Sequence, residues 1–288
     1  MASGIVMAVG VTACSPAAAR ASADVSAEPA LSSTQSANPP RATQGASALT
    51  ASFARLQSQL GGRIGLAVVP VGPAGHTQPG AVQWGTLTSE VAWSTSKVPL
   101  VIAALARASG STVQTLARAA ITRSDNAAAE RLWRELGNAT AAGNSMNSVL
   151  VALGDPTTRT QTRVVRAGFS AFGQTQWTAK DQAKVASALP CSQPARTVYD
   201  LMGKIDPGQA WGLGTISGAR FKGGWGPDTQ GRYLVRQMGV LMVKGVPVIG
   251  VSMLSKPSDG SFSAGTSALT AIAHWLTAHL AAFPKGHC

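Results

Sequence analysis

A serine and a lysine three residues apart, Ser94 and Lys97, are the first pair in this sequence that could perform chemistry. If the segment is helical, the two side chains lie on one face, one turn apart. A serine hydroxyl is a weak nucleophile until a base removes its proton, and lysine becomes such a base when burial or nearby cations lower its pKa. The spacing predicts a nucleophile at Ser94 and a base at Lys97, although Ser-x-x-Lys also arises by chance about once in such a chain.

The residues that follow the pair predict how it is positioned. Residues 98–106 are almost wholly apolar, which predicts a helix buried on nearly every side with Ser94 at its N-terminus. A negative charge that develops on a reacting oxygen there is stabilised by the positive end of the helix dipole. The sequence therefore indicates a serine placed for acyl transfer.

Hydrophobic periodicity predicts the elements that surround this helix. The pattern predicts helices at 51–60 and 266–283, helical periodicity from 112 to 201, and strands at 63–71, 81–88, 219–222, 232–244 and 246–255. We expect an α+β fold in which strands from both ends of the chain form one antiparallel sheet with flanking helices. The middle of the chain would form an all-helical subdomain, with the active site in the cleft between the two parts.

Two further stretches fall where that cleft would need polar groups. Ser124-Asp125-Asn126 lies in a break between helical segments, and Lys222-Gly223-Gly224 ends a predicted strand. In this order, Ser-x-x-Lys, Ser-Asp-Asn and Lys-Gly-Gly resemble the three motifs of the penicillin-recognising serine acyl-enzyme superfamily, which includes the class A β-lactamases and D,D-peptidases. The flanking residues 119–129 and 153–159 also resemble that superfamily, and the likeness covers residues 50–284.

The resemblance implies a role for each motif residue. It implies that Ser94 is acylated, that Lys97 is its base, and that Ser124 relays a proton to the leaving nitrogen. Asn126 would bind a substrate amide, and Lys222 would hold positive potential near Ser124 and the substrate carboxylate.

The strand that carries the third motif would bind the substrate with its backbone. The resemblance implies an oxyanion hole made by the backbone N–H groups of Ser94 and Trp225. Trp225 is on the same strand as Gly223 and Gly224, which the resemblance makes substrate-binding residues. Arg232, ten residues past Lys222, is a candidate second carboxylate ligand, although a solvated strand face is an equal expectation for Arg232 and Arg236.

Three departures from the superfamily pattern are visible. Ser94 and Ser124 are 30 residues apart, about half the spacing associated with class A enzymes, which predicts an open cleft. Gly223 replaces the hydroxyl residue of the third motif, which would weaken carboxylate binding by about 1 to 3 kcal/mol. No Glu follows Glu135, and residues 161–166 hold no carboxylate where the deacylating glutamate is expected, so we expect slow deacylation.

Composition excludes several other functions. Hydrophobic residues make up 45% and charged residues 12% of the 288 residues, which is typical of a globular protein. The net charge of +12 indicates a solvated basic surface or attraction to anionic wall polymer or lipid headgroups, without the aromatic interleaving expected of nucleic-acid binding. The four His residues are not spaced as metal ligands, so we expect no metal and no cofactor. Trp93 and Trp225 could pack in the core or line the cleft.

The N-terminus resembles an export signal. Residues 1–14 are mostly apolar and end in Val11-Thr12-Ala13-Cys14, which is similar to the lipobox of bacterial lipoproteins, and Cys14 would carry the lipid. No Lys or Arg precedes Cys14, so an incidental cysteine in a frayed terminus stays an alternative. Residues 15–47 predict a disordered tether and residues 48–288 the folded domain. We expect an exported protein that is lipid-anchored on the outer face of the cell membrane.

The other two cysteines form an even pair once Cys14 is lipidated. A disulfide between Cys191 and Cys288 is expected in an oxidising compartment, with two free thiols as the alternative.

Two function classes remain at this point. The motifs favour a monomeric serine hydrolase that acts on β-lactams or on D-alanyl stem peptides of the cell wall. The departures favour a catalytically impaired, wall-binding lipoprotein that keeps the fold.

Overall fold

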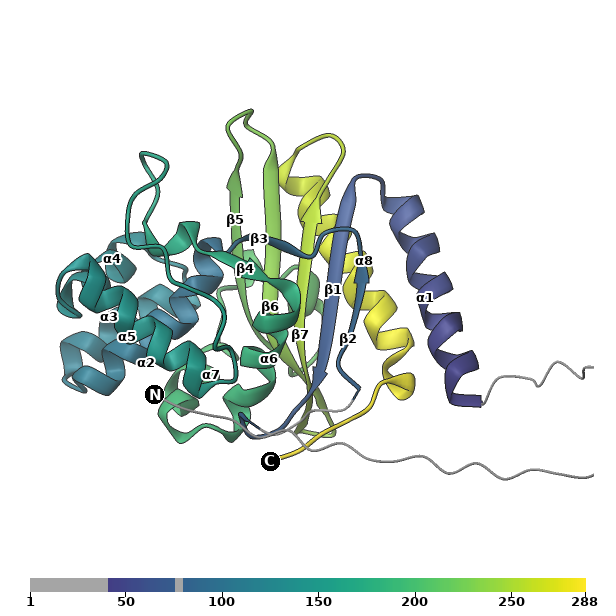
Figure 1. The fold of residues 1–288 in the computed structure, drawn as a ribbon, viewed down its shortest axis with the longest axis horizontal. Coiled ribbons are helices and arrows are strands. Elements are labelled where there is room, and N and C mark those ends of the chain that lie inside the picture. Colours follow the sequence, from purple (N-terminus) through teal and green to yellow (C-terminus); the bar gives the residue numbers. More distant parts are fainter. Residues whose placement is uncertain (1–40, 76–79) are drawn as a thin grey trace, which may run out of the picture. The chain divides into compact units, whose positions relative to one another are not determined.

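The computed structural model describes residues 41–75 and 80–288 (Figure 1). The predicted signal segment with Cys14, and most of the predicted tether, lie outside the described residues. Residues from Pro40 onward form one compact unit, whose architecture is described here by itself.

Five antiparallel strands form the main sheet, in the order β2-β1-β7-β6-β5. Their bounds are β1 Arg63–Pro70, β2 Val82–Gly85, β5 Arg220–Pro227, β6 Tyr233–Val243 and β7 Val246–Lys256. Strand β1 pairs with β7 along its whole length, so the two ends of the folded chain share one sheet. The α+β fold predicted from the sequence is confirmed, and β5, which carries the third motif, forms one edge of the sheet.

Helices cover both faces of this sheet. On one face lie α1 (Arg41–Leu60) and α8 (Phe262–Ala278) (Figure 1). Their residues Phe53, Leu269 and Ile272 join the sheet side chains in one buried cluster. On the other face α6 (Ala179–Ala188) packs against β7 and β1. Contact is close because Gly250 has no side chain: a Cβ there would lie 2.3 Å from the backbone nitrogen of Ser187.

A second core belongs to the helical subdomain. Its helices are α2 Lys97–Arg107, α3 Ser111–Thr122, α4 Asn126–Glu135, α5 Ala139–Ala152 and α7 Arg196–Leu201. The apolar run after Lys97 forms α2, and its residues from Lys97 to Ala104 are all buried, as the sequence predicts. Because α3, α4, α5 and α7 all contact α2, this helix is the centre of the subdomain and fixes the position of the first motif.

Several boundaries differ from the prediction. Helix α1 begins at Arg41, directly after Pro39-Pro40, so residues 41–47 are helical and not part of a tether. Helix α8 begins earlier than predicted because Ser261 caps it by accepting a hydrogen bond from the Ala264 N–H.

The stretch predicted as wholly helical also contains a strand. Gln176–Thr178 (β4) pairs with Ser89–Val91 (β3) in a small two-stranded sheet. Three residues are too few to show an alternating pattern, and the partners are far apart in the sequence, so only the tertiary fold brings them together. Strand β5 likewise extends past its predicted end, through glycines that pair with β6.

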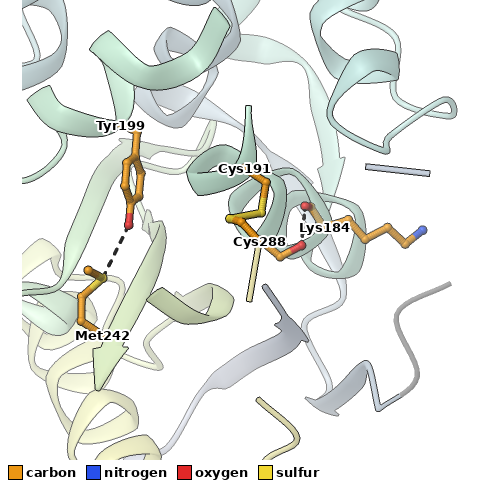
Figure 2. The surroundings of a disulfide bond; sticks show 6 residues. Lys184, Cys191, Tyr199, Met242 and Cys288 are labelled. Atoms are coloured by element: carbon orange, nitrogen blue, oxygen red, sulfur yellow. Dashed lines mark hydrogen bonds between the residues drawn. A yellow bond between two sulfur atoms is a disulfide. The ribbon is translucent and has the colours of Figure 1, made fainter. Parts of the chain in front are cut away.

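A disulfide joins Cys191, after α6, to Cys288 at the C-terminus, with Cα atoms 5.2 Å apart (Figure 2). Beside it, the Tyr199 hydroxyl lies 3.5 Å from the Met242 sulfur. Within the described part of the chain, no helix combines the length and apolar character needed to cross a membrane. The same residues hold no group of three metal-ligating side chains.

Candidate active site

Ser94 lies in a tight 3₁₀ turn, Trp93–Ser96, that leads directly into α2. Two side chains hold the turn: Thr95 Oγ1 donates to the Ala92 carbonyl at 2.5 Å, and Ser96 Oγ donates to the Trp93 carbonyl at 2.6 Å. Trp93 has φ of 47°, an uncommon left-handed conformation. The serine is half-buried at the N-terminus of α2, and none of the described residues hydrogen-bonds to its hydroxyl.

Lys97 is buried and joins the first motif to the second. Its Nζ donates to the Ser124 carbonyl at 2.5 Å, to Asn126 Oδ1 at 2.7 Å and to Ser124 Oγ at 3.3 Å. Ser124 has φ of 58°, and Asp125 caps α4 by accepting from the Ala128 N–H. The left-handed residue and the cap form the sharp turn from α3 to α4 that brings Ser124 and Asn126 to the lysine.

Lys222 approaches the same hydroxyl from β5. It is fully buried, and its Nζ donates to Ser124 Oγ at 2.8 Å and to the Gly223 carbonyl at 2.8 Å. Ser124 Oγ therefore lies between two lysine ammonium groups that come from separate elements. This geometry suits a hydroxyl that passes a proton between a base and a leaving group.

Burial adjusts the protonation of both lysines. Desolvation lowers the pKa of Lys97 to about 8, against the opposing charges of Asp125 and Glu130. The pKa of Lys222 lies well below its usual value because of burial and the charge of Lys97. At neutral pH a useful fraction of Lys97 is therefore neutral and able to accept a proton.

The backbone of β5, which carries the third motif, packs directly against the 3₁₀ turn that holds Ser94. At Gly224, a Cβ would lie 2.9 Å from the Ala92 carbonyl oxygen and from the backbone nitrogens of Ser94 and Thr95. Only glycine allows β5 to approach this closely. The backbone N–H of Ser94 thus lies beside β5, where an oxyanion hole with the N–H of Trp225 is expected.

An aromatic cluster takes the space left by the missing hydroxyl residue. At Gly223 a Cβ would lie 3.1 Å from the Trp211 ring, which meets Trp225 edge-on with centroids 5.9 Å apart. Phe262 lies 5.5 Å from Trp225, and both tryptophans are half-buried. Trp93, by contrast, is buried and packs against Phe169.

Of the two arginines, Arg232 is solvated, as one of the two expectations had it, and Arg236 is not. Arg232 lies in the turn before β6, where it is exposed and pairs with Asp228 at 3.4 Å. Arg236 is fully buried, so the solvated strand face expected for it is wrong. Its guanidinium donates to the carbonyls of Glu90, Val91 and Trp177, which belong to the small sheet of β3 and β4.

A buried network that the sequence did not indicate supports the turn of Ser94. Gln182, on α6, donates to Thr95 Oγ1 at 2.9 Å. Its carbonyl accepts from Arg236 at 2.8 Å and from Ser252 at 2.7 Å. These residues lie in separate parts of the sequence with no common motif, so no pattern could have found them.

The loop from α5 to β4 includes residues 161–166, where the resemblance places a deacylating glutamate. Val164 and Val165 are 60% and 67% exposed there. Arg166 places its guanidinium 4.6 Å from the Phe169 ring centroid and donates to the Pro227 carbonyl at 2.5 Å. The loop is therefore attached to the end of β5 by a cation, and residues 161–166 contribute no carboxylate.

Comparison with solved structures gives fold matches to class A β-lactamases. An enzyme from Mycobacterium abscessus has 18% identity and a TM-score of 0.63, over 81% of this chain and 99% of that chain. The TLA-3 extended-spectrum β-lactamase has 11% identity and a TM-score of 0.65, over 81% and 98%. A variant of a class A β-lactamase of the last common ancestor of Gram-negative bacteria has 20% identity and a TM-score of 0.57, over 81% and 99%.

The sequence itself gives a family match. No curated protein matches the chain. A family described as the β-lactamase enzyme family matches residues 106–280, a range that holds Ser124 and Lys222 and begins after Lys97. With this match over more than half of its length, the chain belongs to the β-lactamase enzyme family.

Proposed function

We propose that this protein is a serine hydrolase that forms an acyl-enzyme on Ser94 with β-lactams or D-alanyl peptides and releases the acyl group slowly. The observation that carries the proposal is the convergence of two buried lysines on Ser124 Oγ, at 3.3 and 2.8 Å, beside the turn of Ser94. Holding two lysines in a low-dielectric site is costly, and it is useful where a neutral amine must accept a proton.

Acylation follows from groups that are present. Neutral Lys97 takes the proton of Ser94, whose oxygen attacks the substrate carbonyl, and the oxyanion is held by backbone N–H groups. Ser124 passes a proton to the nitrogen that leaves. A substrate carboxylate near Lys222 stabilises its ammonium form, while Gly223 supplies no hydroxyl to bind that carboxylate.

The loop from α5 to β4 contains no carboxylate at residues 161–166 to act as the general base that class A enzymes use for deacylation. General-base assistance is worth roughly 10²- to 10⁴-fold, so its absence from residues 161–166 supports a long-lived acyl-enzyme. The behaviour would then be closer to that of a penicillin-binding protein than to that of an efficient β-lactamase.

A burst experiment with a chromogenic cephalosporin tests this proposal. We expect about one equivalent of product in the burst, then slow steady turnover, and intact mass should show one adduct that Ser94→Ala removes. Rapid linear turnover without a burst would refute slow release, and a wild-type protein without an adduct would refute the acyl-enzyme itself.

A second candidate is a wall-binding lipoprotein that keeps the fold without turnover. Gly223, in place of a hydroxyl residue, and the net charge of +12 favour it. In either function we propose that Cys14 anchors the protein outside the membrane. Fractionation of Cys14→Ser tests the anchor, because unchanged membrane association would contradict it, and binding to cell-wall polymer without a Ser94 adduct would favour the second candidate.

A further inference from the structure

One carboxylate in the described part of the chain differs from all the others. In residues 41–75 and 80–288, every acidic side chain except Glu130 accepts a hydrogen bond or forms an ion pair, most often in a helix cap, a turn or a surface pair. Glu130 is half-buried and makes neither. A half-buried carboxylate without such a partner is unusual, because burial disfavours its charged form.

Glu130 lies one turn after Asn126 on α4, which packs directly against α2. Residues four apart on a helix share a face, with Cβ atoms about 5 to 6 Å apart. Helical side chains also lean toward the N-terminus of their helix, so that of Glu130 is directed back over Asn126. Asn126 Oδ1 is 2.7 Å from Lys97 Nζ, which places Glu130 next to the base of the site.

Few other charges act on Glu130. Of the helices that pack on α4, α2 contributes Lys97 and the exposed Arg107, α5 has no charged residue, and Arg118 of α3 is exposed. Arg134 lies one turn further along α4 and is exposed. Burial raises the pKa of Glu130, while Arg134 and Lys97 lower it. Glu130 and Lys97 are thus electrostatically coupled.

We propose that Glu130 is the carboxylate that activates water for the slow release of the Ser94 acyl group, which remains when the loop supplies no glutamate. The inference rests on the proposed acyl-enzyme. Glu130 removes a proton from a water molecule, and the water oxygen forms a bond to the ester carbonyl carbon. The bond from that carbon to Ser94 Oγ then breaks, and Lys97 passes the proton from Glu130 to the departing Oγ. The acid product leaves, and both side chains return to their initial forms.

The experiment compares Glu130→Gln with the wild type and with Glu135→Gln. Glu135 is a matched control, because it lies on the same helix but is exposed and pairs with Arg131. Acylation and release are followed separately by mass spectrometry of the β-lactam adduct, at pH 6 and pH 9. Glu130→Asp, which keeps a carboxylate at this position, tests whether the rate of adduct release is restored.

We expect Glu130→Gln to acylate at least as fast as the wild type, because the charge of Glu130 raises the pKa of Lys97. The variant should lose the adduct roughly 10²-fold more slowly at pH 6. At pH 9 the difference should shrink, because neutral Lys97 can then act as the base. Glu130→Asp should recover part of the rate, and Glu135→Gln should match the wild type. Equal adduct loss from Glu130→Gln and wild type at pH 6 overturns the role of Glu130 alone, whereas a wild type that forms no adduct overturns the acyl-enzyme and this inference with it.

Discussion

Replacement of Gly224 by alanine tests the proposed contact between β5 and the nucleophile's turn. The new methyl group would lie 2.9 Å from the Ala92 carbonyl oxygen and from the Ser94 and Thr95 nitrogens. Side-chain carbons essentially never come this close to backbone atoms. Neither side can yield locally, because β5 is paired with β6 at Arg236 and the turn is fixed by α2 and by the hydrogen bond to Gln182.

The strand and the turn must therefore separate by about half an ångström or more. Displacement of a reacting group by about 1 Å costs roughly 10²-fold in rate, and loss of one oxyanion-hole donor costs about 10²- to 10³-fold. We expect the acylation rate of Gly224→Ala to fall by about 10²-fold. Overpacking of this kind typically also lowers the free energy of unfolding by about 1 to 3 kcal/mol.

The assay is the second-order rate of Ser94 modification by a cephalosporin, with urea unfolding as the stability measurement. Gly110→Ala is the control, because Gly110 has φ of −64° and a Cβ there meets nothing within 4 Å. A folded Gly224→Ala protein that acylates within threefold of the wild type would refute the reasoning, because β5 would then not define the geometry around Ser94.

Three further predictions concern the base, the supporting network and the disulfide. The acylation rate should rise with pH through about 8, the pKa of Lys97, because only the neutral amine accepts a proton; a stopped-flow profile that is flat from pH 6.5 to 9 would contradict this. Gln182→Met removes the donor to Thr95 Oγ1 and an acceptor of a buried guanidinium, so it should lower the free energy of unfolding by about 2 to 4 kcal/mol and slow acylation; wild-type urea stability would argue against the network. Replacing Cys191 and Cys288 by serine opens a link across 97 residues and should cost about 2 to 4 kcal/mol; an unchanged thermal midpoint under non-reducing conditions would show that the link does not stabilise the fold.

The sequence alone determined the parts of the fold that depend on local pattern. The apolar run after Lys97 is longer than most buried strands, which favours a buried helix, and α2 is buried as expected. The long strands β6 and β7 and the order of elements were also visible, because alternation and turn residues are local signals. The motifs around Ser94, Ser124 and Lys222 were recognisable for the same reason.

The tertiary structure decided which distant residues meet. Strands β3 and β4 are too short to have a pattern of their own, and their pairing depends on the surrounding fold. The contacts of Arg236 with Gln182, and of Gln182 with Thr95, join three parts of the chain through side-chain hydrogen bonds that carry no sequence spacing. Glu130 is a clear case, because a glutamate on a helix is ordinary in sequence, and only the packing of α4 against α2 places it beside Lys97. Helix and strand patterns and short motifs depend on residues close in sequence, so the sequence shows them. Burial and contacts between distant residues depend on the packing of the whole chain, so only the structure shows them.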